Sequence, residues 1–85
     1  MPANSRNSDP ERAIELLVHA LSPRQREVLA LIGNGSTNAE IGKQLGISER
    51  TVESHRRRVR KVLGIKSTAD LYRIALAWAK FWKPD

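Results

Sequence analysis

The chain has 85 residues, of which 15 are Lys or Arg and 9 are Asp or Glu, so its formal net charge is +6 at neutral pH. A chain of this length holds one modest hydrophobic core, which excludes a two-domain enzyme. It contains no cysteine, which excludes disulfides, thiolate metal ligands and a thiol nucleophile. The strongly basic balance favours a polyanionic partner, although net charge alone specifies no fold.

Neither a membrane segment nor a catalytic set is visible in the sequence. No apolar stretch approaches the roughly 20 residues that span a bilayer, and the polar N-terminus has no apolar signal core. We therefore expect a cytoplasmic protein without a membrane partner. His19 and His55 lie far apart and show no metal-ligand spacing, and no nucleophile, base and acid form a set. We expect no metal, no cofactor, no catalytic residue and no enzyme activity.

Five segments have apolar residues at the spacing of an α-helix, and each follows a polar residue that can cap a helix. Two of them begin with capping boxes, Ser22-Pro23-Arg24-Gln25 and Thr37-Asn38-Ala39-Glu40. No stretch alternates apolar and polar residues over five positions, so no strand is predicted. The sequence therefore predicts an all-α small helical bundle, with helices at 10–20, 23–33, 38–45, 49–63 and from 68 onward.

The first helix, 10–20, is interpreted either as an additional N-terminal helix or as a linker. Its apolar stripe favours packing against the rest of the chain over a free linker. Residues 1–9 carry no such stripe and are predicted to be a disordered tail, while 21–83 are predicted to form the single domain. The stripe consists of Ile14, Leu17, Val18 and Leu21.

Only three residues, Gly46-Ile47-Ser48, separate the third and fourth helices. This spacing is typical of a helix-turn-helix that binds DNA. Gly42 lies where the two helices are expected to cross, and apolar residues on both sides hold the pair together. Any two short amphipathic helices of a bundle can share this spacing, however, so the distribution of charge has to decide between a structural pair and a DNA-binding motif.

The fourth helix carries most of the net charge. Residues 48–66 include seven basic and two acidic side chains, which gives +5 of the total +6. On a helical wheel, Val52, Val59, Leu63 and, at the margin, Val62 face inward. A solvated face normally mixes its signs, whereas the opposite face is mostly basic, which favours DNA binding. That outward face is predicted to hold Arg50, Glu53, Ser54, Arg57 and Lys61.

These five outward residues are the candidates for reading bases. Arg57 ranks first because its guanidinium fork matches the O6 and N7 acceptors of guanine. Arg50 and Lys61 suit either a base or a phosphate. Glu53 has two main interpretations. It can accept a hydrogen bond from a cytosine amino group, or it can orient Arg57, one turn along, through an ion pair. A plain solvated side chain is the third.

Phosphate contacts are expected beside that face and at one helix end. The flanks of the fourth helix are basic, which suits the two phosphate walls of a groove, and Arg60 is predicted to extend the outer face toward the C-terminal end. The exposed amides that open the third helix also suit a phosphate, and plain capping is compatible with that role. His55, at the core margin, is interpreted either as a packed, hydrogen-bonded residue or as a phosphate contact. The candidates are Arg56, Arg58, Arg60, Lys66, Thr37, Asn38 and His55.

Four short motifs occur in order along residues 21–76, namely Leu21-Ser22-Pro23-Arg24, Asn38-x-Glu40-Ile41, Leu45-Gly46-Ile47-Ser48 and Thr51-Val52-x-x-His55. Together they resemble the C-terminal DNA-binding domain of LuxR/GerE-type transcription regulators, most closely the FixJ-type branch. The resemblance implies a four-helix domain whose helix at 49–63 enters the major groove, with base contacts from Glu53, Ser54 and Arg57. Two departures are Gly42, where alanine is usual, and Glu53, where many relatives have lysine.

The resemblance also implies a last helix that commonly forms a two-fold dimer on a pseudo-palindromic site. All four aromatic residues lie in the last fourteen positions. One stripe of this helix, which includes Trp78, Phe81 and Trp82, is predicted to join the core. A second stripe is the candidate dimer or partner surface and consists of Tyr72, Leu76 and Ala79.

Three interpretations follow for the partners. The first is a transcription regulator that binds double-stranded DNA, as a homodimer through the last helix, with RNA polymerase as a further partner. The second is an orphan domain that pairs with a full-length regulator and inhibits or assists it. The third is a module like region four of sigma factors, which shares the Glu-Ile-x-x-x-Leu-Gly-Ile-Ser run but generally lacks the capped helix after Gly64.

Relatives of this type usually attach the domain to a phosphoacceptor receiver or to an autoinducer-binding domain. The resemblance therefore implies a response-regulator output domain. The chain is interpreted either as an excised C-terminal fragment or as a self-contained regulator.

Overall fold

The computed structural model describes residues 10–82. That range contains five helices and no strand, so the predicted all-α fold is confirmed. The predicted tail, 1–9, and residue 83 lie outside the described residues. The helices, in chain order, are α2 (Pro10–Val18), α3 (Pro23–Gly33), α4 (Asn38–Leu45), α5 (Glu49–Leu63) and α6 (Thr68–Ala79).

The predicted capping boxes open α3 and α4. In the first, the Ser22 side chain accepts a hydrogen bond from the Gln25 amide, and the Gln25 side chain accepts one from the Ser22 amide. Thr37 and Glu40 form the same reciprocal pair, with distances of 3.1 and 2.8 Å. Because these bonds involve residues three positions apart, they fix the start of each helix locally, before any tertiary contact forms.

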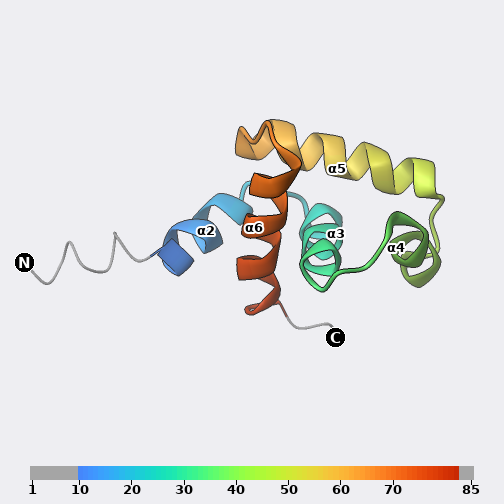
Figure 1. The fold of residues 1–85 in the computed structure, drawn as a ribbon, viewed down its shortest axis with the longest axis horizontal. Helices are drawn as coiled ribbons and strands as arrows, with labels where there is room; N and C mark the ends of the chain where they lie inside the picture. Colours follow the sequence, from blue (N-terminus) through green and yellow to red (C-terminus); the bar gives the residue numbers. More distant parts are fainter. Residues whose placement is uncertain (1–9, 83–85) are drawn as a thin grey trace, which may run out of the picture.

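α3 lies at the centre of the bundle and packs against α4, α5 and α6, with its largest interface on α6. Figure 1 shows α2 and α3 on either side of α6, with α5 across one end of α6 and α4 beyond α3. The core between them is apolar and takes a contribution from every helix. Its largest fully buried side chains are Leu29, Ile41, Leu71, Val18, Val28, Val52 and Val59.

Three side chains that the helical pattern placed in the core are exposed instead, namely Leu17, Val62 and Phe81, with 48%, 42% and 39% of their surface accessible. Leu17 and Val62 line one open hollow at the surface, where α2 passes the C-terminal end of α5. Phe81 follows the end of α6, so the periodicity of that helix does not extend to it. α2 nevertheless packs against α6, and its Val18 is fully buried.

No helix within residues 10–82 combines the length and the apolar character that crossing a bilayer requires. Nor does this part of the chain gather three His, Asp or Glu side chains that could hold one metal ion.

Gly33 packs closely against α6, and a substitution at this position tests the α3–α6 interface. A Cβ at this buried position would overlap the backbone oxygen of Ala75 and would lie 3.0 Å from the Ala79 Cβ. Gly33→Ala should therefore lower the free energy of unfolding by about 1–3 kcal/mol, although alanine normally stabilises a helix relative to glycine. Urea unfolding measures this change. The control is Ala69→Gly at an exposed position of α6, which changes helix propensity without changing a packing contact. An unchanged or higher free energy of unfolding for Gly33→Ala would contradict it.

Candidate nucleic-acid interface

α4 and α5 form the predicted helix-turn-helix, and two glycines set its geometry. Gly46 ends α4 with φ at 71°, in the left-handed region that glycine favours. A Cβ on Gly42 would lie 2.6 Å from the backbone oxygen of Ile47, and the Ile47 amide donates to the Gly42 carbonyl at 2.9 Å. The turn therefore lies closer to α4 than an alanine at position 42 would permit without a shift of the backbone.

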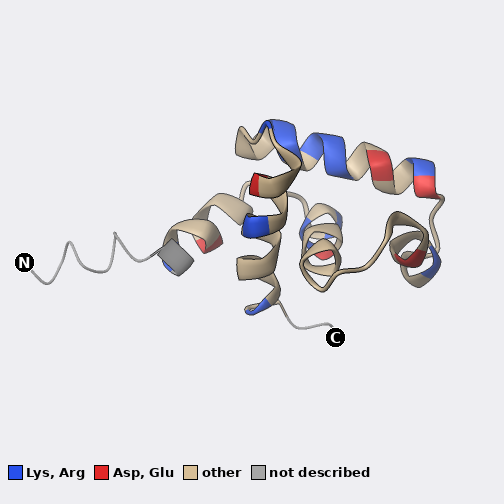
Figure 2. Cartoon of the chain, in the orientation of Figure 1, with Lys and Arg blue, Asp and Glu red and all other residues tan. Residues whose placement is uncertain are grey.

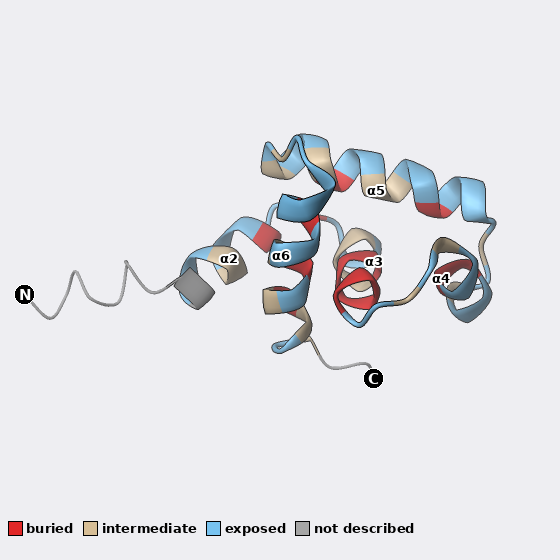
Figure 3. Ribbon diagram, in the orientation of Figure 1, coloured by how far each residue is buried: buried red, intermediate tan, exposed pale blue. Residues whose placement is uncertain are grey.

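The buried side of α5 determines which of its residues face outward. Val52 and Val59 are fully buried, and Leu63 packs against the core. Figure 3 shows this buried side of α5 turned toward α3 and an exposed side opposite to it. All five residues predicted to lie on the outward face are exposed, namely Arg50, Glu53, Ser54, Arg57 and Lys61.

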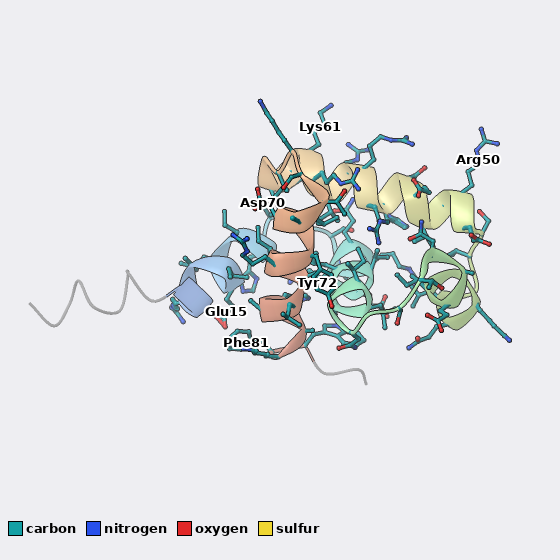
Figure 4. The ribbon with its side chains drawn as sticks, in the orientation of Figure 1. Glu15, Arg50, Lys61, Asp70, Tyr72 and Phe81 are labelled. Atoms are coloured by element: carbon teal, nitrogen blue, oxygen red, sulfur yellow. The ribbon has the colours of Figure 1, made fainter. Side chains whose placement is uncertain are left out.

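The exposed side of α5 is predominantly cationic. Figure 2 shows Lys and Arg recurring along its length, and Figure 4 shows Arg50 and Lys61 projecting away from α3 and α4. An open depression on this side is lined by Ser54, Arg57, Arg58 and Lys61. Three of these four side chains are cations, so the depression concentrates positive potential and attracts anions. Arg58, which the sequence predicted as a phosphate contact, shares this depression with the base-reading candidates.

Glu53 is held by a residue of the preceding helix. The Asn38 side-chain nitrogen donates a hydrogen bond of 2.8 Å to Glu53 Oε1. The ion pairs within residues 10–82 join side chains of α2, α3 or α6 and do not include Glu53 with Arg57. The interpretation in which Glu53 orients Arg57 through an ion pair is therefore wrong for this structure. Nothing in the sequence pattern pointed to Asn38 as the partner of Glu53, because this contact depends on how closely α4 and α5 approach.

Arg56 and Arg60, one turn apart on α5, are half-buried. Burial lowers the pKa of the Arg56 guanidinium, repulsion from Arg60 lowers it further, and attraction to Glu53 partly opposes both. The Arg60 Nε is buried and has no hydrogen-bond partner in the described part of the chain. The prediction that Arg60 extends the outer face is wrong, because its side chain is half-buried and its Nε is covered by neighbouring parts of the domain.

The remaining phosphate candidates lie at the start of α4, on the turn after α5 and, for His55, on α5 itself. In the first turn of α4, the Glu40 and Ile41 amides are bonded to Thr37. The Asn38 and Ala39 amides have no partner within residues 10–82. Lys66 is exposed on the turn after α5. His55 is half-buried, and no hydrogen bond of its ring occurs in the described structure, so the prediction of a hydrogen-bonded histidine is not met there.

A family match decides what this helix-turn-helix belongs to. Residues 19–75 match the family model described as "Bacterial regulatory proteins, luxR family". The chain belongs to the LuxR family. It therefore carries a DNA-binding domain of transcription regulators, and this family is one of regulators rather than of enzymes. The sigma-factor interpretation is set aside, since α6 follows α5 as the LuxR-type resemblance implies.

Regulators of several bacteria are similar to this LuxR-family chain. Transcriptional regulatory protein MctR of Rhizobium johnstonii is 50% identical over 56 residues, which are 66% of this chain and 26% of MctR. Transcriptional regulatory protein TdiR of Thauera aromatica is 44% identical over 66 residues, which are 78% of this chain and 29% of TdiR. Oxygen regulatory protein NreC of Staphylococcus aureus is 43% identical over 56 residues, which are 66% of this chain and 26% of NreC. The chain thus matches less than a third of the length of these relatives.

α6 of this LuxR-family domain exposes two of the three residues predicted to form a dimer or partner surface. Tyr72 and Leu76, one turn apart, are each 47% exposed. Ala79 is half-buried, because its side chain faces Gly33 of α3. The exposed apolar pair on α6 therefore consists of Tyr72 and Leu76, and Ala79 belongs to the α3–α6 interface.

Proposed function

We propose that this LuxR-family domain recognises specific sequences of double-stranded DNA by placing α5 in the major groove. The observation that carries the proposal is the basic, exposed face of α5 opposite the buried Val52 and Val59. α5 has 15 residues and is therefore about 22 Å long. The major groove admits an α-helix and presents a different pattern of donors and acceptors for each base pair.

The roles proposed for the residues of α5 follow from their exposure and from their position along the helix. Arg57 reads guanine from the depression that it shares with Ser54 and Lys61, and Arg50 extends the reading face toward α4. Glu53 lies between Arg50 and Arg57 on this face and reads a base that donates a hydrogen bond.

Phosphates on the two sides of the groove are bound at different places. The free amides at Asn38 and Ala39, beside the Thr37 cap, bind one backbone strand, while Arg58 and Lys66 reach the other. The half-buried residues Arg56, Arg60 and His55 lie at the edge of this surface, where the two arginines add positive charge.

The roles of Arg57 and Arg58 can be separated by measuring affinity for a selected and a scrambled duplex at several salt concentrations. Arg57→Ala should cost about 1–3 kcal/mol of binding free energy on the selected duplex and relax its preference. Arg58→Ala should weaken binding to both duplexes and reduce the slope of log K against log salt by about 0.9. Arg12→Ala is the control, because Arg12 lies on α2 and pairs with Glu15.

Equal losses on both duplexes for Arg57→Ala would make Arg57 a phosphate contact rather than a base reader. An affinity that does not change with salt would contradict groove binding through the basic face of α5.

We further propose that two copies of the domain pair through the Tyr72 and Leu76 surface of α6 on a pseudo-palindromic site. Two half-sites related by a two-fold axis match such a dimer. The same exposed pair favours the second candidate function, in which the domain pairs with a full-length regulator through α6. RNA polymerase stays a predicted partner with no residue assigned to it.

Leu76→Glu should abolish the dimer, because a carboxylate at the centre of an apolar contact has to be desolvated. Sedimentation of the wild type and the variant across a range of concentrations measures this. Leu16→Glu on α2 is the matched control, since Leu16 is 58% exposed and lies outside the α6 surface. A wild type that stays monomeric at high concentration, both free and on DNA, would contradict pairing through α6.

A further inference from the structure

One hydrogen bond joins the two helices of the helix-turn-helix through their side chains. Asn38, the first residue of α4, donates to Glu53 on the exposed face of α5, at 2.8 Å and across 15 positions of sequence. Within residues 10–82 no other hydrogen bond connects the side chains of two different helices. The contact therefore couples the start of α4 directly to the surface that faces the groove.

The chemistry of the pair fixes its orientation. An ionised carboxylate only accepts hydrogen bonds, so Asn38 must present its NH₂ group rather than its oxygen to Glu53. This leaves Glu53 Oε2 as a free acceptor on the exposed face. In the major groove, cytosine presents the N4 amino donor, whereas guanine N7 and O6 and thymine O4 are acceptors that a carboxylate repels. Adenine presents its N6 donor next to the N7 acceptor, so cytosine suits a single carboxylate oxygen best.

The backbone amide of Asn38 is available for a different contact. It is one of the two free N–H groups in the first turn of α4, where a phosphate is favoured by the helix dipole. One residue thus carries a phosphate-binding amide in its backbone and a carboxylate-binding amide in its side chain.

We propose that Asn38 is a positioning residue that holds Glu53 for the recognition of a cytosine amino group. The inference rests on the proposed placement of α5 in the major groove. Without Asn38, the Glu53 carboxylate is free to pair with Arg57 at i+4, which takes both side chains away from the bases.

The test is a selection of binding sites from random duplexes, followed by competition among four duplexes that differ at one base pair. The wild type should prefer cytosine at one position of each half-site, and Glu53→Ala should remove that preference. Asn38→Ala should reduce it about tenfold, the range of a single mismatched pair, and should change the affinity for scrambled duplex less than about twofold, because the backbone amide of this residue is retained. Asn38→Asp preserves the size of the side chain but replaces the donor by a like charge, so it should reduce the preference at least as far and should also weaken binding to every duplex through repulsion from phosphate.

A double variant distinguishes positioning from an independent contact. If Asn38 acts through Glu53, Asn38→Ala should cause no further loss of cytosine preference in the Glu53→Ala background, because the two effects are coupled. Asn34→Ala is the matched control, since Asn34 is an exposed asparagine at the end of α3 and should leave the preference unchanged. Thermal unfolding followed by circular dichroism checks that every variant is folded.

Two results would overturn the inference and leave DNA binding by α5 intact. In one, both Asn38 variants keep the full cytosine preference. In the other, Asn38→Ala weakens binding to all four duplexes equally. A wild type that selects no sequence at all would overturn the inference together with the proposed function.

Discussion

The burial of Val52 and Val59 fixes the rotation of α5 about its own axis, and the whole outward surface depends on it. The two side chains lie two turns apart and are fully buried. Burying a side chain of this kind stabilises a protein by about 1.5–3 kcal/mol relative to leaving it exposed. Any rotation of α5 that turns Arg57 inward would expose both valines and bury a charge, so the basic face has one stable orientation.

A second constraint sets the position of α4 relative to that face. The left-handed conformation of Gly46 turns the chain within three residues, and Gly42 lets the turn approach α4 closely. The closeness of the two helices brings Asn38 to Glu53. Gly42 and Gly46 thus determine which polar group meets the Glu53 carboxylate on the exposed face of α5.

The features that could be predicted from the sequence are those that depend on neighbours along the chain. Thr37 and Glu40 form their capping box three positions apart, so the start of α4 was predictable. The outward position of Arg57 was predictable as well, because two valines define the opposite stripe. Val62 and Arg60 lie at the margins of that stripe, where the neighbouring helices decide between burial and exposure, and a helical wheel cannot place such residues. The contact of Asn38 with Glu53 depends on the approach of two helices and leaves no periodic signal.

Methylation interference on a selected duplex tests most directly whether α5 occupies the major groove. Methylation of guanine modifies N7, which lies in the major groove, whereas methylation of adenine modifies N3, which lies in the minor groove. We expect guanine N7 methylation within each half-site to block binding and adenine N3 methylation there to be tolerated. Interference by adenine N3 methylation alone, with guanine N7 methylation tolerated throughout the site, would contradict the placement of α5 in the major groove.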